Sequence, residues 1–192
     1  MSTNPYLDTV LALFGNEHEP LYADQFSLDS AAKTRVLGIR QRLVEEYSWA
    51  IPDANAIRRI AALQPIVEFG AGSGYWAQQL SEAGVRIRAF DVTSSNRWFG
   101  VEEDDGSLLG KFADHTLLLC WPPFGSSMAA KTLGSFAGET VIYIGEPRGG
   151  CTADDDFFDM LSADFVCIET SEIPKWPGIH DKMHTFRRMS RP

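Results

Sequence analysis

The stretch that decides the fold is Ile66-Val67-Glu68-Phe69-Gly70-Ala71-Gly72-Ser73-Gly74-Tyr75-Trp76, an apolar run with one acid followed by three glycines at alternate positions. The apolar run predicts a buried strand. The glycines predict a tight turn into a helix, because glycine lacks the Cβ that a sharp bend or a close ligand contact excludes. The first N–H groups of such a helix have no partner within it. A corner of this kind is typical of a binding site for a nucleotide-like ligand.

The residues around the glycines narrow the type of ligand. A dinucleotide fingerprint places its third glycine at position 75, where this chain has Tyr75. A phosphate-binding P-loop requires a lysine after its last glycine, and none follows here. Glu68 would repel a diphosphate but can pair with a cation. The turn therefore favours a cationic ligand without phosphate.

Residues 67–74 resemble motif I of the class I S-adenosylmethionine-dependent methyltransferases, which reads apolar, apolar, Asp/Glu, x, Gly, x, Gly, x, Gly. A second apolar segment ends in Asp91, 17 residues after Gly74, which leaves room for one helix and a turn. In the family, an acid at this place accepts hydrogen bonds from the ribose hydroxyls, as in dinucleotide folds. The resemblance covers about residues 66–188 and identifies no subfamily.

The resemblance implies S-adenosylmethionine as the cofactor, whose ammonium and sulfonium suit Glu68. Asp104 or Asp105 is expected near the adenine. The residues that we expect to bind the cofactor are Glu68, Gly70, Ala71, Gly72, Gly74, Trp76, Asp91, Val92, Asp105, Cys120 and Trp49.

Strand and helix patterns alternate from Ile66 onward, which indicates an α/β fold. We expect a three-layer sandwich with a mostly parallel seven-stranded sheet and helices on both faces. The expected strands span residues 66–69, 86–90, 98–102, 116–120, 140–144, 165–169 and 184–188.

The region before Ile66 is predicted to be helical. Apolar residues recur at helical spacing in residues 5–14, Ser30 is expected to cap a second helix, and a third is expected from Pro52 to about Leu63. Residues 1–64 would form a helical cover over an α/β core of residues 65–192, within a single domain of residues 1–192.

The composition is that of a soluble globular protein. Of the 192 residues, 44% are hydrophobic and 22% charged, and no apolar run has the length of a membrane span. The N-terminus lacks a basic segment followed by an apolar one. We therefore expect a cytoplasmic protein without membrane contact, and the sequence does not predict its oligomeric state.

The charge balance disfavours nucleic acid as a substrate. The chain has 17 basic against 26 acidic residues and a formal net charge of −9, whereas proteins that grip nucleic acid usually present many basic groups to the phosphates. We interpret the arginine clusters as solvated charges. Their members are Arg35, Arg40 and Arg42, and Arg187, Arg188 and Arg191.

No metal site is expected. The cysteines Cys120, Cys151 and Cys167 fit neither a disulfide framework nor a zinc site. The four histidines are scattered without a matching carboxylate or thiol spacing.

We expect the substrate to bind at the segment after the fourth expected strand, which reads Trp121-Pro122-Pro123-Phe124. It resembles the Asn/Asp-Pro-Pro-Tyr/Phe motif of methyltransferases that modify planar exocyclic or amide nitrogens. In that motif the first side chain accepts a hydrogen bond from the target amine, but the indole of Trp121 accepts none. A nucleobase amine is therefore disfavoured, and the aromatic wall suits an apolar or cationic acceptor better. A rigid packed turn is the alternative interpretation.

Two further residues are candidates for proton transfer. Glu146 lies in a glycine-rich loop after the fifth expected strand, where it can act as a base or bind an amine, or simply pair with Arg148. His180 stands beside Asp181 and is a candidate general base near neutral pH, or a solvated histidine.

These observations predict S-adenosylmethionine-dependent methyl transfer to a small-molecule or protein acceptor. Positioning the donor and nucleophile in line supplies much of the acceleration in such a reaction. One alternative is a non-catalytic S-adenosylmethionine-binding or scaffolding protein. Others are an N-methyltransferase acting on a nucleobase or amide nitrogen, and a nucleotide-binding oxidoreductase, against which Tyr75 argues.

Overall fold

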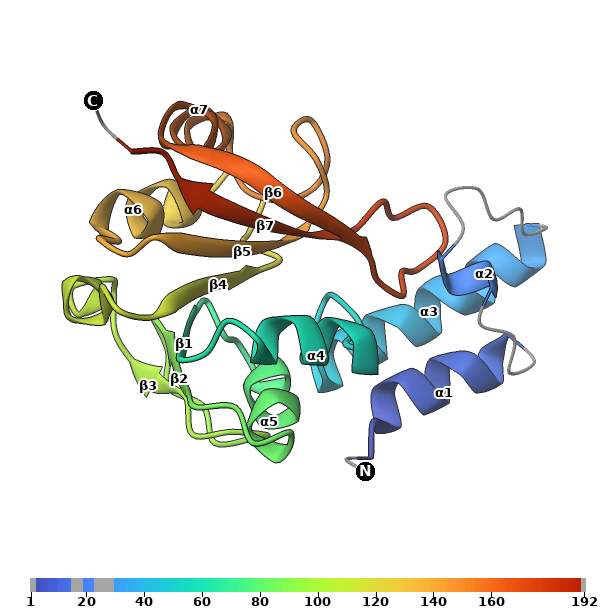
Figure 1. Ribbon diagram of the computed structural model, residues 1–192. Coiled ribbons are helices and arrows are strands. Elements are labelled where there is room, and N and C mark those ends of the chain that lie inside the picture. Colours follow the sequence, from blue (N-terminus) through green and yellow to red (C-terminus); the bar gives the residue numbers. More distant parts are fainter. Residues whose placement is uncertain (1–2, 15–18, 23–29, 191–192) are drawn as a thin grey trace.

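The computed structural model describes residues 3–14, 19–22 and 30–190. Within them, a seven-stranded sheet has the order β3-β2-β1-β4-β5-β7-β6 (Figure 1). β7 runs antiparallel to both of its neighbours, and the other pairs are parallel. The expected mostly parallel sheet is confirmed. Its strands are β1 (Ile66–Phe69), β2 (Ile87–Asp91), β3 (Glu102–Glu103), β4 (Thr116–Cys120), β5 (Thr140–Gly145), β6 (Phe165–Glu172) and β7 (Lys182–Arg188).

β1 lies between β2 and β4, and all four of its residues are buried. Its first residue, Ile66, pairs with Ile87 of β2 and with Thr116 of β4. From β1 the chain fills the sheet first in one direction, through β2 and β3, and then in the other, through β4 and β5. Such a reversal leaves a crevice beyond the carboxyl ends of the strands.

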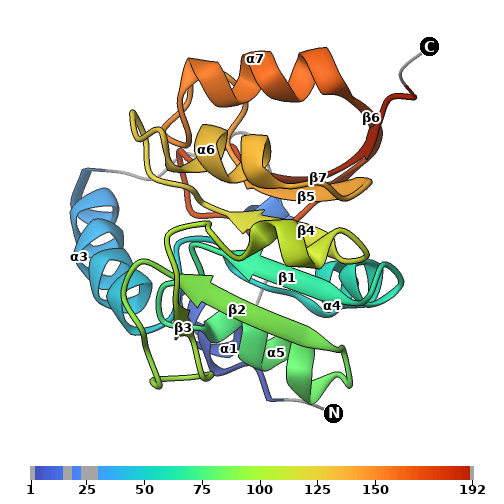
Figure 2. The ribbon, with the colours of Figure 1, turned by 90° about the vertical axis from the view of Figure 1, so that its left-hand side faces the viewer.

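Helices cover both faces of the sheet, as Figures 1 and 2 show. Val67 and Phe69 belong to the hydrophobic cluster on one face, and Ile66 belongs to the cluster on the other. This alternation follows from the two-residue period of a strand. The first cluster includes α6 (Met128–Ser135), α7 (Asp155–Asp164) and the 3₁₀-helix η1 (Leu109–Phe112), and the second includes α4 (Ala54–Ala61) and α5 (Tyr75–Glu82).

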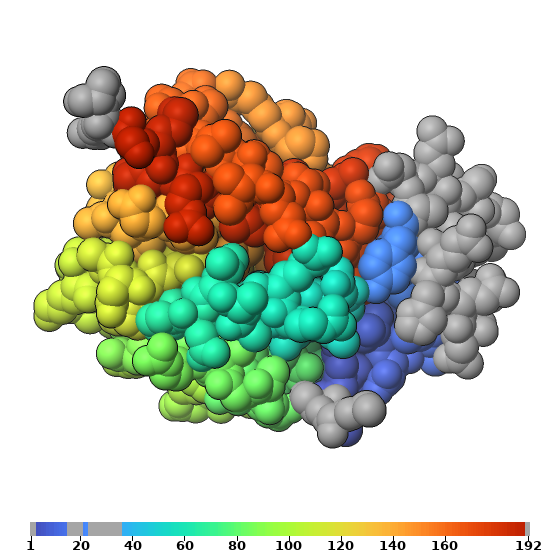
Figure 3. Space-filling model, viewed as in Figure 1, coloured from blue at the N-terminus to red at the C-terminus, as the bar shows by residue number. Residues whose placement is uncertain are grey.

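The N-terminal helices lie at one end of this sandwich (Figure 1). They are α1 (Pro5–Leu13), α2 (Glu19–Tyr22) and α3 (Ser30–Glu46). α3 begins at Ser30, which was expected to cap it; the Ser30 side chain lies outside the described part of the structure, so that a capping role is not described. In the space-filling view, α4 and α5 form a continuous surface with the N-terminal segment beside them (Figure 3).

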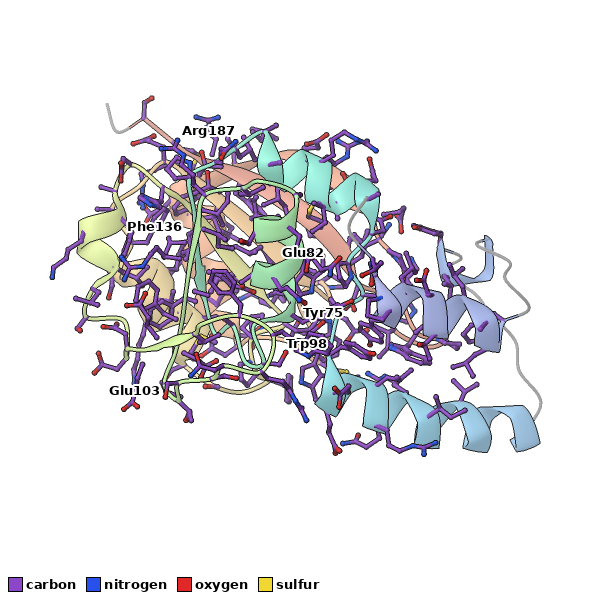
Figure 4. The ribbon with its side chains drawn as sticks, turned by 90° about the horizontal axis from the view of Figure 1, so that it is seen from below. Tyr75, Glu82, Trp98, Glu103, Phe136 and Arg187 are labelled. Atoms are coloured by element: carbon purple, nitrogen blue, oxygen red, sulfur yellow. The ribbon has the colours of Figure 1, made fainter. Side chains whose placement is uncertain are left out.

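Tyr75 connects these N-terminal helices to the glycine turn. Its hydroxyl donates a hydrogen bond to Asn4 (2.9 Å) and accepts one from the backbone N–H of Tyr6 (3.4 Å). Figure 4 shows Tyr75 beside Trp98. Their ring centroids are 5.2 Å apart. The residue that replaces a dinucleotide-binding glycine thus serves to anchor the cover.

Some boundaries differ from those expected. The third helix, α4, begins at Ala54 and not at Pro52, because the Asp53 side chain accepts the Ala56 N–H (2.7 Å) and caps it. α4 packs on one face of the sheet. β3 is shorter and later than expected, since Trp98 lies in a loop where its indole donates to the Glu46 carbonyl (2.7 Å).

In the parts of the chain that the structure describes, no helix has both the length and the apolar character needed to cross a bilayer.

Gly74 offers a direct test of the turn. An added Cβ would lie 2.9 Å from Val101 and 3.0 Å from Phe99, in a backbone conformation with φ +80°. We expect Gly74→Ala to lower the free energy of unfolding by about 3 kcal/mol or more, because strain and overlap add. Urea unfolding measures the change.

Gly84→Ala is the matched control. Gly84 has φ +81°, but a Cβ there would meet nothing within 4 Å. Only the left-handed backbone penalises this variant, by about 1–2 kcal/mol. Equal losses in the two variants would show that the packing of the turn against residues 99–101 is not tight.

Candidate functional site at the carboxyl edge of the sheet

The glycine turn joins β1 to α5 along a left-handed backbone path. Gly70, Gly72 and Gly74 all have positive φ, at +77°, +53° and +80°. At Gly70, a Cβ would lie 2.6 Å from the terminal carbon of Met128, so the turn and the start of α6 are in close contact. Non-glycine residues rarely adopt these conformations. The turn therefore brings bare backbone to the carboxyl edge of the sheet.

Asp91 lies directly beside this turn. It ends β2, whose preceding residue Phe90 pairs with Phe69 at the end of β1. Its carboxylate accepts the N–H of Gly72 (2.9 Å) and that of Thr93 (3.4 Å). The structure thus brings the predicted acid and the predicted glycines together.

A cavity of about 460 Å³ opens beside these residues, within the size range of small-molecule sites. Backbone of the glycine turn, the ends of β1, β2 and β4, and the segment after α3 all contribute to its wall. The lining residues are Val44, Glu45, Tyr47, Ser48, Trp49, Glu68, Phe69, Gly70, Ala71, Gly72, Ser73, Trp76, Asp91, Val92, Cys120, Trp121, Pro123, Ser126 and Met128.

Glu68 is a buried acid in the wall of this cavity. Its side chain is 2% exposed, and its Oε2 atom is buried without a hydrogen-bond partner. Burial, and to a smaller extent the charge of Asp91, raises the pKa of Glu68 to about 8. A buried carboxylate without donors is unfavourable. A cationic group in the cavity would supply the missing donors.

The end of α3 closes one side of the cavity. Its last carbonyls have no partner within the helix, and side chains around the cavity bind them instead. Arg97 donates to the Glu45 carbonyl (2.7 Å), and the hydroxyl of Ser73 donates to the carbonyl of Tyr47. α3 stands beyond the sheet edge in Figure 2.

Trp121 forms another part of the cavity wall. Its ring stacks on that of Trp49, with centroids 4.9 Å apart and planes 10° from parallel. Its indole N–H donates to Asp181 (2.7 Å), and its backbone has φ +52°, which is unusual for a large side chain. The next residue, Pro122, accepts the N–H of Ala153 (2.9 Å) at its carbonyl. The segment after β4 is therefore rigidly held.

Asp181, the sequence neighbour of His180, binds the indole of Trp121. It is 2% exposed, and its Oδ1 atom is buried without a hydrogen-bond partner. Burial raises the pKa of Asp181 to about 7, although the Trp121 hydrogen bond opposes this shift.

Glu146 holds two loops together outside the cavity lining. Its carboxylate accepts the backbone N–H of Cys151 (2.6 Å) and that of His180 (3.0 Å). Burial raises the pKa of Glu146, but these hydrogen bonds outweigh burial and keep the pKa below its ordinary value. The alternative pairing of Arg148 with Glu146 is not formed, since Arg148 binds Asp155 and Asp159. Glu146 thus has the surroundings of a structural residue.

The predicted site residues divide into two groups. The cavity lining contains Trp49, Glu68, Gly70, Ala71, Gly72, Trp76, Asp91, Val92, Cys120, Trp121 and Pro123. The lining does not contain Gly74, Asp105, Pro122, Phe124, Glu146 or His180. Of these, Phe124 is 71% exposed.

The loop after β3 explains why neither adjacent acid reaches the cavity. Asp104 is buried and binds its own loop: it accepts the N–H of Gly106 (2.6 Å) and the hydroxyl of Ser107 (2.9 Å). Asp105 accepts the N–H of Ser107 (3.2 Å) and is exposed.

Sequence reasoning missed several lining residues, among them Val44, Glu45, Ser126 and Met128. The helical period of α3 signals a buried face, which includes Val44, but it does not say what that face meets. Ser126 and Met128 follow the proline segment after β4, so their proximity to that segment was the one available signal.

Among residues 3–14, 19–22 and 30–190, no group of three or more His, Cys, Asp and Glu side chains is placed to hold a metal ion.

No protein-family model and no curated protein matches the chain. Solved structures do resemble it. The 1,6-didemethyltoxoflavin-N1-methyltransferase of Burkholderia thailandensis, solved with 1,6-didemethyltoxoflavin and S-adenosylhomocysteine, is 18% identical with a TM-score of 0.53, covering 88% of this chain and 94% of that one. The magnesium protoporphyrin IX methyltransferase of Synechocystis PCC 6803, solved with S-adenosylmethionine, is 13% identical with a TM-score of 0.50, covering 98% of both chains.

A structure from Rhodobacter sphaeroides described as a putative zinc-dependent alcohol dehydrogenase is 12% identical with a TM-score of 0.51, covering 81% of this chain and 98% of that one. At such identities, likeness shows the fold alone. The chain has the α/β Rossmann-like fold of class I methyltransferases, and its function must be argued from the cavity.

The buried acid Glu68 predicts a pH-dependent stability. Its pKa of about 8 in the folded protein lies above the ordinary value of 4.5, so the folded state binds the proton more tightly. The resulting stabilisation is present at low pH and is lost as the pH rises from 4.5 through 8. Glu68→Gln mimics the protonated acid. Between about pH 5 and pH 8, we expect the wild type to lose at least about 1.4 kcal/mol relative to this variant, the equivalent of one pKa unit.

Urea unfolding at several pH values measures this difference. Asp181, whose pKa is also raised, is present in both proteins, so its contribution is expected to cancel in the comparison. Glu45→Gln changes an exposed acid on the cavity wall and should follow the wild type. Parallel pH profiles for the wild type and Glu68→Gln would mean that Glu68 is ionised in the folded protein throughout this range.

Proposed function

We propose that the protein is an S-adenosylmethionine-dependent methyltransferase acting on a small-molecule or protein acceptor. One observation carries the proposal: the cavity beside the glycine turn holds a buried, unpartnered acid, Glu68, and a second acid, Asp91, at the end of the neighbouring strand. The first suits an ammonium group, and the second suits ribose hydroxyls.

Different residues of the cavity would bind different groups of the cofactor. Glu68 would accept hydrogen bonds from the ammonium, which lowers the cost of keeping its carboxylate buried. Asp91 accepts one hydrogen bond from each of two backbone N–H groups. Its carboxylate has further lone pairs that can accept hydrogen bonds from ribose hydroxyls. The glycine backbone leaves room for close contact.

When bound, S-adenosylmethionine supplies an electrophilic methyl group. Trp49, Trp121 and Pro123, which line the same cavity, would border the acceptor and hold it in line.

Several observations argue against an acceptor nitrogen held by the Trp-Pro-Pro-Phe segment. The indole N–H of Trp121 is bound to Asp181, the carbonyl of Pro122 already accepts the Ala153 N–H, and Phe124 is exposed outside the cavity lining. The net charge of −9 also opposes nucleic acid as an acceptor.

A non-catalytic S-adenosylmethionine-binding protein is the second candidate. The direct stacking of Trp49 on Trp121 favours it, because these rings cover each other's faces at the cavity wall. Incubation with radiolabelled cofactor and a cell extract separates the two functions: label in a product supports transfer, and tight binding without labelled product supports the alternative.

Calorimetry with four ligands tests the cavity assignment. We expect S-adenosylmethionine and S-adenosylhomocysteine to bind, and NAD not to bind, since Tyr75 replaces the third dinucleotide glycine. Glu68→Gln should weaken the first two by about tenfold or more, the size of a charge-assisted hydrogen bond. It should not weaken 5′-methylthioadenosine, which lacks the ammonium.

Asp91→Asn is the matched variant for the ribose contact, and it should weaken S-adenosylmethionine, S-adenosylhomocysteine and 5′-methylthioadenosine alike. Tighter binding of NAD than of S-adenosylmethionine would contradict the proposal and favour an oxidoreductase. If Glu68→Gln weakened the binding of 5′-methylthioadenosine as much as that of S-adenosylmethionine, Glu68 would not contact the ammonium.

A further inference from the structure

Arg40 lies on α3, beside residues that line the cavity. It precedes Val44 by one helical turn, so the two side chains share a helix face, and Val44 lines the cavity. Its guanidinium lies over the ring of Trp49, 5.6 Å from the centroid. Trp49 also lines the cavity and is 45% exposed. Arg40 is not itself among the lining residues, but its cation stands directly beside Trp49, on the wall that the proposed acceptor would meet.

The charge of Arg40 is incompletely satisfied. Its Nε atom is buried without a hydrogen-bond partner, and the described residues form no ion pair with it. The nearby carboxylate of Asp181 attracts the guanidinium of Arg40, but its Oδ2 atom already accepts a hydrogen bond from the indole of Trp121. A buried N–H without an acceptor is costly. An incoming anion would satisfy it.

The cavity offers the acceptor no obvious base. Its titratable lining groups are Glu45, Tyr47, Glu68, Asp91 and Cys120. Glu68 and Asp91 are assigned to the cofactor, and burial raises the pKa of the Cys120 thiol. Glu45 accepts a hydrogen bond from Gln41, and the Tyr47 ring is stacked on Tyr6 and Trp98. The attacking atom must therefore arrive with a free lone pair.

We propose, resting on the methyltransferase function above, that the acceptor is a small planar aromatic carboxylate whose carboxylate binds Arg40. A guanidinium forms two parallel hydrogen bonds with such a group. The aromatic ring packs against the exposed part of Trp49.

The chemistry needs no proton transfer. A lone pair on the acceptor forms the bond to the methyl carbon while the carbon–sulfur bond breaks. The electrons of that bond stay on sulfur, which becomes the neutral thioether of S-adenosylhomocysteine.

Matched carboxylate and amide probes test this inference. Nicotinate and nicotinamide share one ring, one size and one ring-nitrogen lone pair, and differ in charge. We expect nicotinate to bind the complex with S-adenosylhomocysteine about tenfold or more tightly than nicotinamide, as measured by calorimetry. Arg40→Gln should abolish the preference, and Arg40→Lys should retain part of it, because lysine keeps the charge but loses the paired geometry.

Arg42→Gln is the matched control, since Arg42 lies on the same helix and is exposed. It should leave the preference unchanged, and all three variants should bind S-adenosylhomocysteine as the wild type does. The inference is overturned if the amide binds as well as the carboxylate, if neither binds at about 10 mM, or if Arg42→Gln acts like Arg40→Gln. Failure of S-adenosylhomocysteine itself to bind would instead refute the proposed function.

Discussion

The parallel pairing of β1 with β2 and β4 is the constraint on which the site depends. It aligns three carboxyl ends, so that Glu68 near the end of β1, Asp91 at the end of β2 and Cys120 at the end of β4 border one cavity. The hydrogen bond from Gly72 to Asp91 fixes the glycine turn against the second strand. Helices on both faces bury the sheet and leave this edge free for chemistry.

Local sequence patterns predicted the glycine turn, the strand and helix on either side of it, and the acid at the end of the next strand. The alternation of apolar residues and glycines in 66–76 determines a strand, a turn and a helix, and the spacing to Asp91 is a property of one β-α-β unit. The strands 66–69 and 116–120 lie where they were expected. β3 was misplaced because Trp98, a residue typical of strands, instead binds the end of α3 through its indole.

The substrate side was less predictable, because its contacts join residues far apart in the chain. No local signal connects Trp121 to Asp181, 60 residues later, or Glu146 to His180, 34 residues later. Glu146 looks like a catalytic acid in its glycine-rich loop, yet its oxygens hold two loops together. Arg40 looks like a solvated helix charge, yet its guanidinium lies over the ring of Trp49, which lines the cavity. Only the tertiary arrangement distinguishes these roles.

The binding of the end of α3 by Ser73, Arg97 and Trp98 has a kinetic consequence. These donors belong to the glycine turn and to the loop after β2, which lie beside the cavity. Moving the end of α3 away from the cavity therefore requires these hydrogen bonds to break together, and not one after another. The exchange rate of a ligand that needs this movement is then set by the fraying of a single helical turn, so residence time and affinity depend on different residues.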